Sequence, residues 1–530
     1  MRERDYDVIV IGAGLGGLLA AARFLRRGQT VAVVERLAHP GGRFTAKTFQ
    51  GAQVSTGAVH MLPFGSNGEL AGMLRALGVP HRVHDAEVFA SFHVRGRQYV
   101  CRSVLQLAAV LGARQFAELL RLGGEMMLAR SRPEDRARSF QSWLSRRVSR
   151  ERSPEVYAYF ERICHFALSV DLADISYPEV VLTAKNMLRY GAPGIVDGGC
   201  AAVTGELERR VRADGGDLRL RHDVLEIQSE DGRVTGLRVR DRDRDEDLLL
   251  RAPLVVSNIG PAATRRLVAA GDGSTAGDGA DGAAGLERPN AASGEGHGAV
   301  RREASGLKVH LLSDRSIIGH KGIMYCLDTE RIAGIVQPSN SDRRLAPPGK
   351  HLLITHQIMR GDDVNVEREA ARADLRRLFG DDFGTHVTVL TMSQYRGEWP
   401  VNRIVQGEDV SPVGDLAGLY LVGDAVKPSG YLMVEGVAQS VNWMLDLLDR
   451  PAGAPAVAAG GPDVAARAIP AYRPRRPARY RSLYWLVAPP PPHRDSSRPV
   501  TIPMATSGGT VDAASVPIPA TPATPGTDGE

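Results

Sequence analysis

The first thirty-five residues alternate between short apolar runs and a stretch of helical period. Residues 8–11 are apolar and β-branched, which is typical of a strand buried on both faces. Residues 18–27 have a helical pattern, and Gly28 stands where a helix is expected to stop. Residues 30–34 form a second apolar run. This order predicts a βαβ unit whose two strands run parallel.

The middle of the chain has other patterns. Residues 70–190 are mostly helical in period, and several of these segments are apolar over most of their surface. Such helices either pack inside a core or line an apolar cavity, and core packing explains most of the positions. Residues 305–314 and 350–359 are predicted to be strands of a separate sheet. The fold class expected from these patterns is α/β.

Two segments have the composition of unfolded chain. Residues 271–304 are rich in Gly, Ala and Asp and too poor in large apolar residues to build a core, which predicts a disordered insertion. Residues 451–530 hold 16 of the 32 prolines, and within them tyrosines and Trp485 alternate with arginines. This basic aromatic tail is either an arm that rests on an anionic membrane or a solvated linker.

Charge and cysteine content narrow the classes of protein. The net charge is +5, but residues 467–498 carry eight arginines and one aspartate, or +7, so the rest of the chain carries about −2. A body so close to neutral argues against nucleic-acid binding. Four scattered cysteines without a C-x-x-C pair argue against a disulfide framework or a metal site, and neither a signal peptide nor a membrane-spanning run is visible. We expect a cytoplasmic protein, with membrane association through the tail as the alternative.

A glycine motif follows the first predicted strand. Gly12, Gly14 and Gly17 occupy the three glycine positions of G-x-G-x-x-G, and they permit a tight turn, close approach of a pyrophosphate, and packing of the helix on the strand. The helix N-terminus then offers free N–H groups to the phosphates. Glu35 ends the second strand, where an acid accepts hydrogen bonds from ribose hydroxyls and repels a 2′-phosphate. These residues predict a dinucleotide site that disfavours NADP.

The residues after Glu35 distinguish the dinucleotides. Gly41, Gly42 and Arg43 follow the acid closely, and with this succession the chain resembles the flavin-dependent amine oxidase and phytoene desaturase superfamily. The resemblance implies FAD, with Arg43 near its pyrophosphate and flavin. No cysteine follows Cys326, so the FAD is expected to be bound non-covalently. The fold implied is a discontinuous Rossmann-type FAD-binding domain with an inserted mixed α+β substrate domain.

The resemblance also divides the chain. It assigns residues 1–70, 195–265 and 410–450 to the FAD-binding domain. Residues 71–194 and 305–409 then form the substrate domain.

Five later residues are implied to contact the cofactor. By resemblance, Val224 contacts the adenine through its backbone, and Asp424, after Gly423, supports the ribityl and pyrophosphate region. A helix beginning near Gly436 and Val437 is expected to direct N–H groups at the N1–C2=O2 edge of the flavin. Reduced flavin is anionic at that edge, and a helix N-terminus stabilises negative charge.

Three functions fit the resemblance. The first is an FAD-dependent oxidoreductase that desaturates, saturates or isomerises an apolar polyene or isoprenoid. The second is a flavin amine oxidase, in which Lys308 corresponds to a lysine that binds a water at flavin N5, although an exposed strand lysine is an equal alternative. His60 lies where such enzymes approach the flavin and is a second catalytic candidate, although a core histidine is the simpler interpretation. The third is a prenyl-binding carrier without flavin, like the Rab GDP-dissociation inhibitors.

Overall fold

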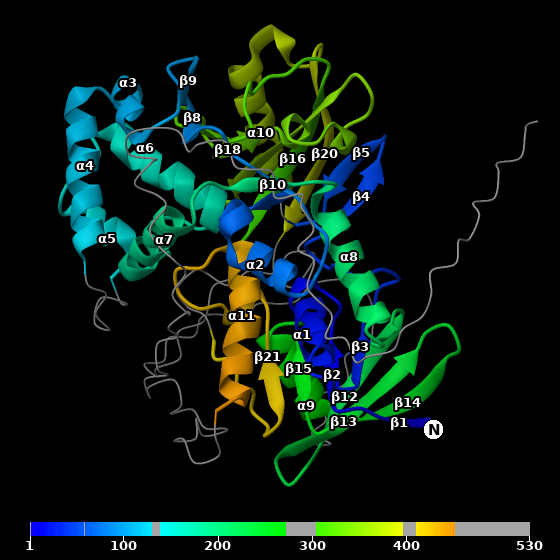
Figure 1. Ribbon diagram of the computed structural model, residues 1–530. Coiled ribbons are helices and arrows are strands. Elements are labelled where there is room, and N and C mark those ends of the chain that lie inside the picture. Colours follow the sequence, from blue (N-terminus) through cyan, green and yellow to red (C-terminus); the bar gives the residue numbers. More distant parts are fainter. Residues whose placement is uncertain (1, 58, 130–137, 272–303, 396–409, 451–530) are drawn as a thin grey trace, which may run out of the picture. The chain divides into compact units, whose positions relative to one another are not determined.

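A computed structural model gives the structure of most of the chain (Figure 1). The predicted insertion, residues 271–304, lies outside the described residues except at its two end positions, and the tail, residues 451–530, lies outside them entirely. None of the described helices is long and apolar enough to cross a membrane. The residues described are 2–57, 59–129, 138–271, 304–395 and 410–450.

A five-stranded sheet joins three distant parts of the described chain. Every pair of neighbouring strands in it is parallel. Its central strands read VIVI and VAVV and are wholly buried, because both faces of the sheet are covered. This sheet confirms the predicted α/β fold with a Rossmann-type domain. In sheet order the strands are β11 (Asp217–Arg219), β3 (Val31–Val34), β2 (Val8–Ile11), β15 (Val255–Ser257) and β21 (Leu419–Leu421).

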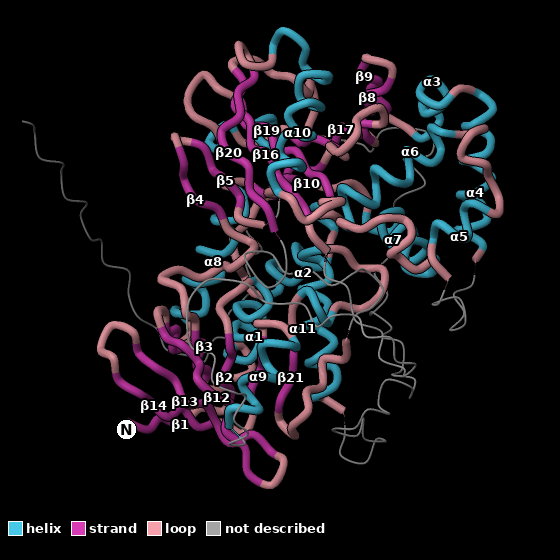
Figure 2. Tube along the Cα trace, turned by 180° about the vertical axis from the view of Figure 1, so that it is seen from behind, coloured by secondary structure: helices cyan, strands magenta, loops and turns pink. Residues whose placement is uncertain are grey.

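Helices pack on one face of this sheet and a second sheet lies on the other (Figures 1 and 2). Val8 and Val10 point into a core shared with the helices, whereas Ile9 and Ile11 point into a core shared with the second sheet. The alternation follows from the two-residue period of a strand. The helices are α1 (Leu15–Leu25), α2 (Glu69–Ala76), α8 (Gly199–Ala213) and α11 (Met433–Leu448); the second sheet contains β1 (Arg2–Asp5), β14 (Glu246–Arg251), β13 (Arg233–Asp241) and β12 (His222–Glu230), and α9 (Pro261–Gly271) packs on β12.

A larger, seven-stranded sheet is built from other parts of the described chain. Leu352 and Ile354 face a core shared with helices α4 to α7, and Leu353 faces a core shared with α10. Its strands in order are β20 (Val387–Tyr395), β16 (Gly306–Ser313), β19 (His351–Ile358), β18 (Gly334–Val336), β17 (Ile323–Cys326), β8 (Ala90–Val94) and β9 (Arg97–Cys101); the helices are α3 (Leu107–Leu111), α4 (Ala113–Leu128), α5 (Phe140–Ser145), α6 (Pro154–Ile163), α7 (Tyr177–Tyr190) and α10 (Val364–Phe379).

Smaller elements complete the described part of the fold. A three-stranded sheet has the order β6 (Met61–Leu62), β10 (Gly194–Val196), β7 (Val83–Asp85), and β4 (Ala46–Phe49) pairs with β5 (Ala52–Ser55). Single helical turns are η1 (Gly65–Asn67), η2 (Val104–Gln106), η4 (Cys164–Leu168), η5 (Pro338–Asn340), η6 (Arg343–Leu345), η7 (Gly380–Asp382) and η8 (Asp424–Val426).

Two local predictions are corrected by the structure. The segment 83–101, expected to be helical, contains β7 to β9, and Arg95 and Gly96 turn the β8–β9 hairpin with positive φ angles of 53° and 68°. The sequence pattern of residues 218–230 predicts one strand, but the structure divides this stretch between β11 and β12. Arg221 breaks it with a φ of +58°, a conformation that no glycine or proline announces in the sequence.

Candidate cofactor site and catalytic residues

A cleft of about 900 Å³ opens at the carboxyl ends of four strands of the parallel sheet. Its lining includes the residues that follow β2, β3, β15 and β21, namely Gly12, Glu35, Asn258 and Gly423. The carboxyl edge is where doubly wound sheets bind ligands, because the helix that follows each strand presents its N-terminus there. The cleft is therefore the candidate cofactor site.

The glycine motif forms the floor of this cleft. Gly12 has a φ of +90°, and a Cβ on Gly17 would lie 2.0 Å from the Gly12 carbonyl oxygen, so both positions require glycine. Gly14 precedes α1, whose N-terminus has no side-chain cap, and it lines the cleft together with the first residues of the helix. Uncapped N–H groups and the positive end of the helix dipole suit a diphosphate. The structure thus gives the three predicted glycines the positions that a dinucleotide needs.

Glu35 lies at the end of β3 and is held by the backbone. One carboxylate oxygen accepts the Ala13 N–H at 2.8 Å, and the other accepts the Leu37 N–H at 2.9 Å. The side chain is only 8% exposed yet lines the cleft. The two hydrogen bonds from the backbone hold the carboxylate in one orientation beside the cleft.

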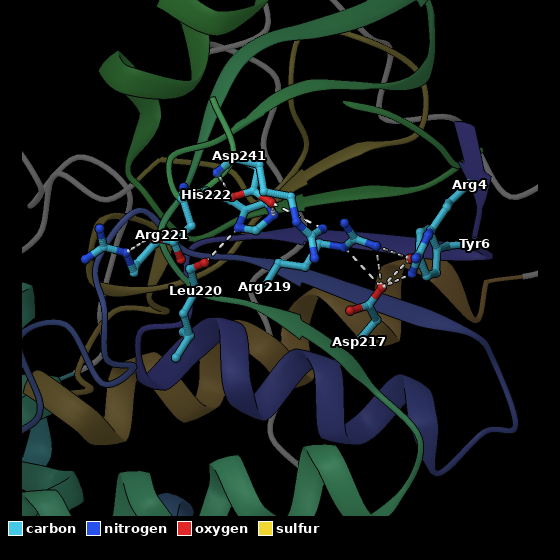
Figure 3. A network of polar contacts seen from close by, with 10 residues as sticks. Arg4, Tyr6, Asp217, Arg219, Leu220, Arg221, His222 and Asp241 are labelled. Atoms are coloured by element: carbon cyan, nitrogen blue, oxygen red, sulfur yellow. Dashed lines mark hydrogen bonds and ion pairs between the residues drawn. The ribbon is translucent and has the colours of Figure 1, made fainter. Parts of the chain in front are cut away.

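After the turn between β11 and β12, His222 and the predicted Val224 line the cleft beyond Glu35. Figure 3 shows His222 between Leu220 and Asp241. The His222 Nδ1–H donates to the Leu220 carbonyl oxygen at 2.7 Å. Nearby, the Asp217 carboxylate accepts hydrogen bonds from Tyr6 and Arg219, which ties the first strands to β11. This network fixes the cleft wall that the family resemblance assigns to the adenine.

Arg43 and Asp424 face each other across the cleft lining. Gly42, with a φ of +53°, brings the chain over the glycine motif, and a Cβ built on it would lie 3.5 Å from the Gly14 Cα. Arg43 Nη1 is 3.6 Å from Asp424 Oδ2, and both residues line the cleft. This pair therefore joins the N-terminal cofactor motif to the motif after β21.

The helix after β21 begins earlier than predicted. α11 starts at Met433, and the Gly436 N–H already donates to the Leu432 carbonyl oxygen at 3.1 Å. Met433, Val434 and Val437 line the cleft, but Gly436 does not. The expected role of the Gly436 N–H at a flavin edge is therefore not supported. The residues at the start of the helix that do line the cleft are Met433 and Val434.

Asn258 is a site residue that was not assigned from the sequence. A Cβ on Gly14 would lie 2.6 Å from Asn258 Nδ2, and a Cβ on Gly16 or Gly423 would lie 2.6 or 2.7 Å from Asn258 Oδ1. Glycine at these three positions leaves room for one carboxamide in the cleft wall. The available signal in the sequence was the pair Ser257 and Asn258, which ends the apolar run that begins at Leu254.

The two predicted catalytic residues lie behind the cleft lining. Lys308 is 1% exposed on β16, and its Nζ donates to the Ser55 carbonyl oxygen at 2.9 Å. Ser55 lines the cleft, as does Ser393, the β-sheet partner of Lys308. Lys308 therefore contacts the cleft lining at Ser55 and is not the exposed lysine considered above.

His60 is fully buried and lines neither the cleft nor the smaller cavity beside it, which is described next. Its Nε2–H donates to the Gln53 carbonyl oxygen at 2.8 Å, and its Nδ1 accepts the Cys200 N–H at 3.1 Å. Burial lowers the pKa of His60 to about 4, so it is neutral near pH 7. With both ring nitrogens occupied by the backbone, His60 has the environment of a structural histidine, and a catalytic role is not supported.

A second, smaller cavity adjoins the cleft. Gly57 and Met433 line both, and the cavity has a volume of about 40 Å³. Most of its other lining residues are apolar: Val59, Met61, Pro63, Phe166, Ala167, Met187, Pro193, Ile323 and Leu432, with Tyr325 and His356 as the polar ones.

Glu435, in the first turn of α11, gives the fold a pH dependence. Its buried carboxylate accepts the N–H groups of Phe64 and Leu70, and burial raises its pKa to about 7 from the usual 4.5. Between pH 4.5 and 7 the unfolded chain releases this proton while the folded chain retains it. The free energy of unfolding should therefore fall by up to roughly 3 kcal/mol as pH rises through this window.

Glu435→Gln should remove this contribution. Thermal unfolding midpoints measured from pH 4.5 to 8 should fall less steeply in Glu435→Gln than in the native chain. The control is Glu330→Gln, which should keep the native slope because Glu330 is 64% exposed. An unchanged slope in Glu435→Gln would contradict the assignment.

Comparisons with known proteins identify the family of the chain. The family model for flavin containing amine oxidoreductases matches residues 15–440. An uncharacterized protein of Methanocaldococcus jannaschii is 30% identical over 433 residues, which cover 82% of this chain and 96% of that protein.

Solved structures give the same result. An oxidoreductase from Methanosarcina mazei is 31% identical with a TM-score of 0.70, and the match covers 84% of this chain and 100% of that one. A putrescine oxidase shares the fold at 16% identity and a TM-score of 0.60, covering 84% of this chain and 100% of that one. The family resemblance predicted from the sequence is thus confirmed, and it supports an oxidoreductase over a flavin-free carrier. The chain belongs to the flavin-containing amine oxidoreductases, a family of FAD-dependent oxidoreductases.

Proposed function

We propose that this protein binds FAD non-covalently in the cleft and oxidises, reduces or isomerises an apolar polyene or isoprenoid in the adjoining cavity. The cleft residues would hold the dinucleotide: the glycine motif its pyrophosphate, Glu35 its ribose, and Arg43 and Asp424 its central part. The flavin supplies the hydride-transfer chemistry. The protein's own part is to bind the substrate, orient it and exclude water.

The observation that carries the substrate class is the apolar lining of the second cavity. At Gly57 and Met433 it meets the cleft, next to the start of α11. Methionines are prominent in its wall, and their unbranched side chains rearrange easily to admit a larger ligand. The cavity offers no carboxylate to bind an ammonium group among its described lining residues. This chemistry favours a hydrocarbon substrate.

Two relatives have names that correspond to the two candidate substrates, a polyene and an amine. Prolycopene isomerase from Daucus carota is 38% identical over 76 residues, and putrescine oxidase from Kocuria rosea is 40% identical over 75 residues. Each match covers 14% of this chain. Such short matches do not favour either substrate, so the choice rests on the cavity.

Amine oxidation is the second candidate, and the observation in its favour is the buried Lys308 beside the cleft wall. Against it, Tyr431 packs edge-on against Phe64 and at a tilt against Tyr190, and it lines neither cavity. An amine site would be expected to hold its substrate between two aromatic rings. Tyr431 does not supply such a ring, because it faces neither the cleft nor the second cavity.

Anaerobic reduction of the bound flavin tests the proposal. Purified protein should be yellow. An isoprenoid polyene should bleach the oxidised flavin if it is desaturated, restore the colour of chemically reduced flavin if it is saturated, or be recovered as an isomer with no net change in the flavin. Putrescine should not bleach the flavin. Mass spectrometry of lipid extracts from the purified protein would identify the polyene to use. If putrescine or another amine bleaches the flavin and no polyene is converted, the protein is an amine oxidase and the polyene hypothesis is wrong.

Lys308→Met separates the same two functions by a different measurement. In an amine oxidase, loss of this lysine should slow reoxidation of the reduced flavin by oxygen at least tenfold, whereas a polyene enzyme should change less than threefold. We expect the smaller effect, measured by stopped-flow absorbance. Lys321→Met, which removes a surface lysine paired with Glu87, is the matched control.

A further inference from the structure

Helix α4 carries apolar side chains on the side that packs on the protein and also on the side that faces solvent. Leu119, Leu122 and Met126 are buried in the core shared with the seven-stranded sheet. On the other side of the helix, Leu120 is 44% exposed and Leu128 is 86% exposed. Because a helix that is apolar all round is normally buried all round, the exposed side of α4 is a candidate interaction surface.

The exposed residues of α4 form one stripe along the helix, which we call the α4 outer face. Its apolar and small residues follow one another at intervals of three or four, the spacing that keeps residues on one side of a helix. Arg114 and Arg121 are seven residues apart and lie along one edge of the stripe. None of the exposed residues of α4 is a carboxylate. The α4 outer face consists of Ala113, Arg114, Ala117, Leu120, Arg121, Gly124 and Leu128.

Arginines outnumber glutamates at the edge of this face. Arg114 Nη1 lies 3.6 Å from Glu118 Oε1, and Glu125 is shared by Arg121 and Arg147. These three arginines and two glutamates sum to +1. The arginine of the first pair is also the more exposed partner, with 60% of its side chain in solvent against 28% for Glu118. The face thus combines exposed leucines with a basic edge, which suits an anionic surface.

The size of the α4 outer face argues against a second protein as its occupant. The helix has 16 residues, and at about 1.5 Å per residue and a width of about 10 Å its face covers roughly 240 Å². Stable protein interfaces bury about 800 Å² on each partner. A lipid surface needs no matched partner area, because lipids rearrange around inserted side chains while arginine side chains reach the phosphates at the edge.

We propose that the α4 outer face docks on an anionic lipid bilayer. The helix lies along the bilayer surface, because its inner side is held in the protein core. Leu120 and Leu128 enter the headgroup region, and Arg114 and Arg121 contact lipid phosphates. This docking does not rest on the proposed substrate, although a bilayer is where a free polyene would dissolve.

A fluorescent label on this face tests the docking in the full-length, flavin-loaded protein. The four native cysteines are buried, so Leu128→Cys can be labelled selectively with a polarity-sensitive dye. Vesicles of phosphatidylglycerol and phosphatidylcholine should shift the dye emission to shorter wavelength, and vesicles of phosphatidylcholine alone should shift it less. Val366→Cys on α10, where Val366 is 57% exposed, is the matched control and should not respond.

Cosedimentation with the anionic vesicles gives a second measurement. Leu120→Glu should lower the partition coefficient about tenfold, because it replaces an inserted leucine with a charge of the same sign as the lipid. Val366→Glu makes the same change of charge on α10 and should stay within about twofold of the native value.

Three results would overturn the proposal. The first is native protein that does not bind the anionic vesicles, and the second is protein that binds them without an emission shift at the Leu128→Cys label. The third is a shift that grows with protein concentration in the absence of vesicles, which would show that a second copy covers the face. None of these measurements uses flavin reduction, so failure of the docking and failure of the proposed function are distinguishable.

Discussion

Gly14→Val should give a folded protein that contains less than a tenth of the native flavin. A Cβ at this position already meets Asn258 Nδ2 at 2.6 Å, and the two further methyl groups of valine extend into the cleft where the pyrophosphate is expected. Asn258 must move to admit the Cβ, and the methyl groups still occupy the space expected for the pyrophosphate, so the dinucleotide is excluded. Flavin content is measured from the visible absorbance of the purified protein and from the flavin released on denaturation.

A matched control shows whether the loss is local. Gly205, in α8, has no heavy atom within 4 Å of a Cβ, so Gly205→Val should keep its flavin. Far-UV circular dichroism should show that both variants are folded. Native flavin content in Gly14→Val would refute the placement of the pyrophosphate at the glycine motif.

Val59→Phe should slow anaerobic reduction of the flavin by a polyene at least tenfold while the flavin content stays unchanged. Val59 is 6% exposed and lines the cavity of about 40 Å³, which a phenyl ring would largely fill. The rate is followed by stopped-flow absorbance with the polyene identified from the lipid extracts.

The control substitution makes the same change of side chain on the surface. Val366, in α10, is 57% exposed, so Val366→Phe should reduce at the native rate. If Val59→Phe also reduces at the native rate with its flavin retained, the polyene does not use the second cavity, and the substrate site must be sought elsewhere along the cleft.

The parts of the site that the sequence predicted are those encoded within one short segment. Gly12, Gly14, Gly17 and Glu35 lie close together in the chain, and each has a backbone or dipole reason for its position. Their mutual arrangement follows from one βαβ unit. The sequence was therefore sufficient to predict this βαβ unit and the part of the cleft that it lines.

The parts that were missed depend on contacts between distant segments. Asn258 was not assigned because its importance lies in the space left by glycines of two other strands. The start of α11 was placed one turn too late because Leu432, its N-cap residue, gives no capping signal. His60 became a catalytic candidate through its place in the family pattern, beside the simpler interpretation of a core histidine. The sequence could not decide between the two, because the backbone partners Gln53 and Cys200 become visible only in the folded structure.

The order of strands in the parallel sheet has a consequence for biosynthesis. β2 and β21 flank β15 on opposite sides, although Val8 and Leu419 lie at distant points of the chain. The ribosome must therefore release nearly all of the described chain before Asp424 and α11 can close the cleft. Flavin loading is expected to follow translation, and a nascent chain stalled before β21 would emerge without its prosthetic group.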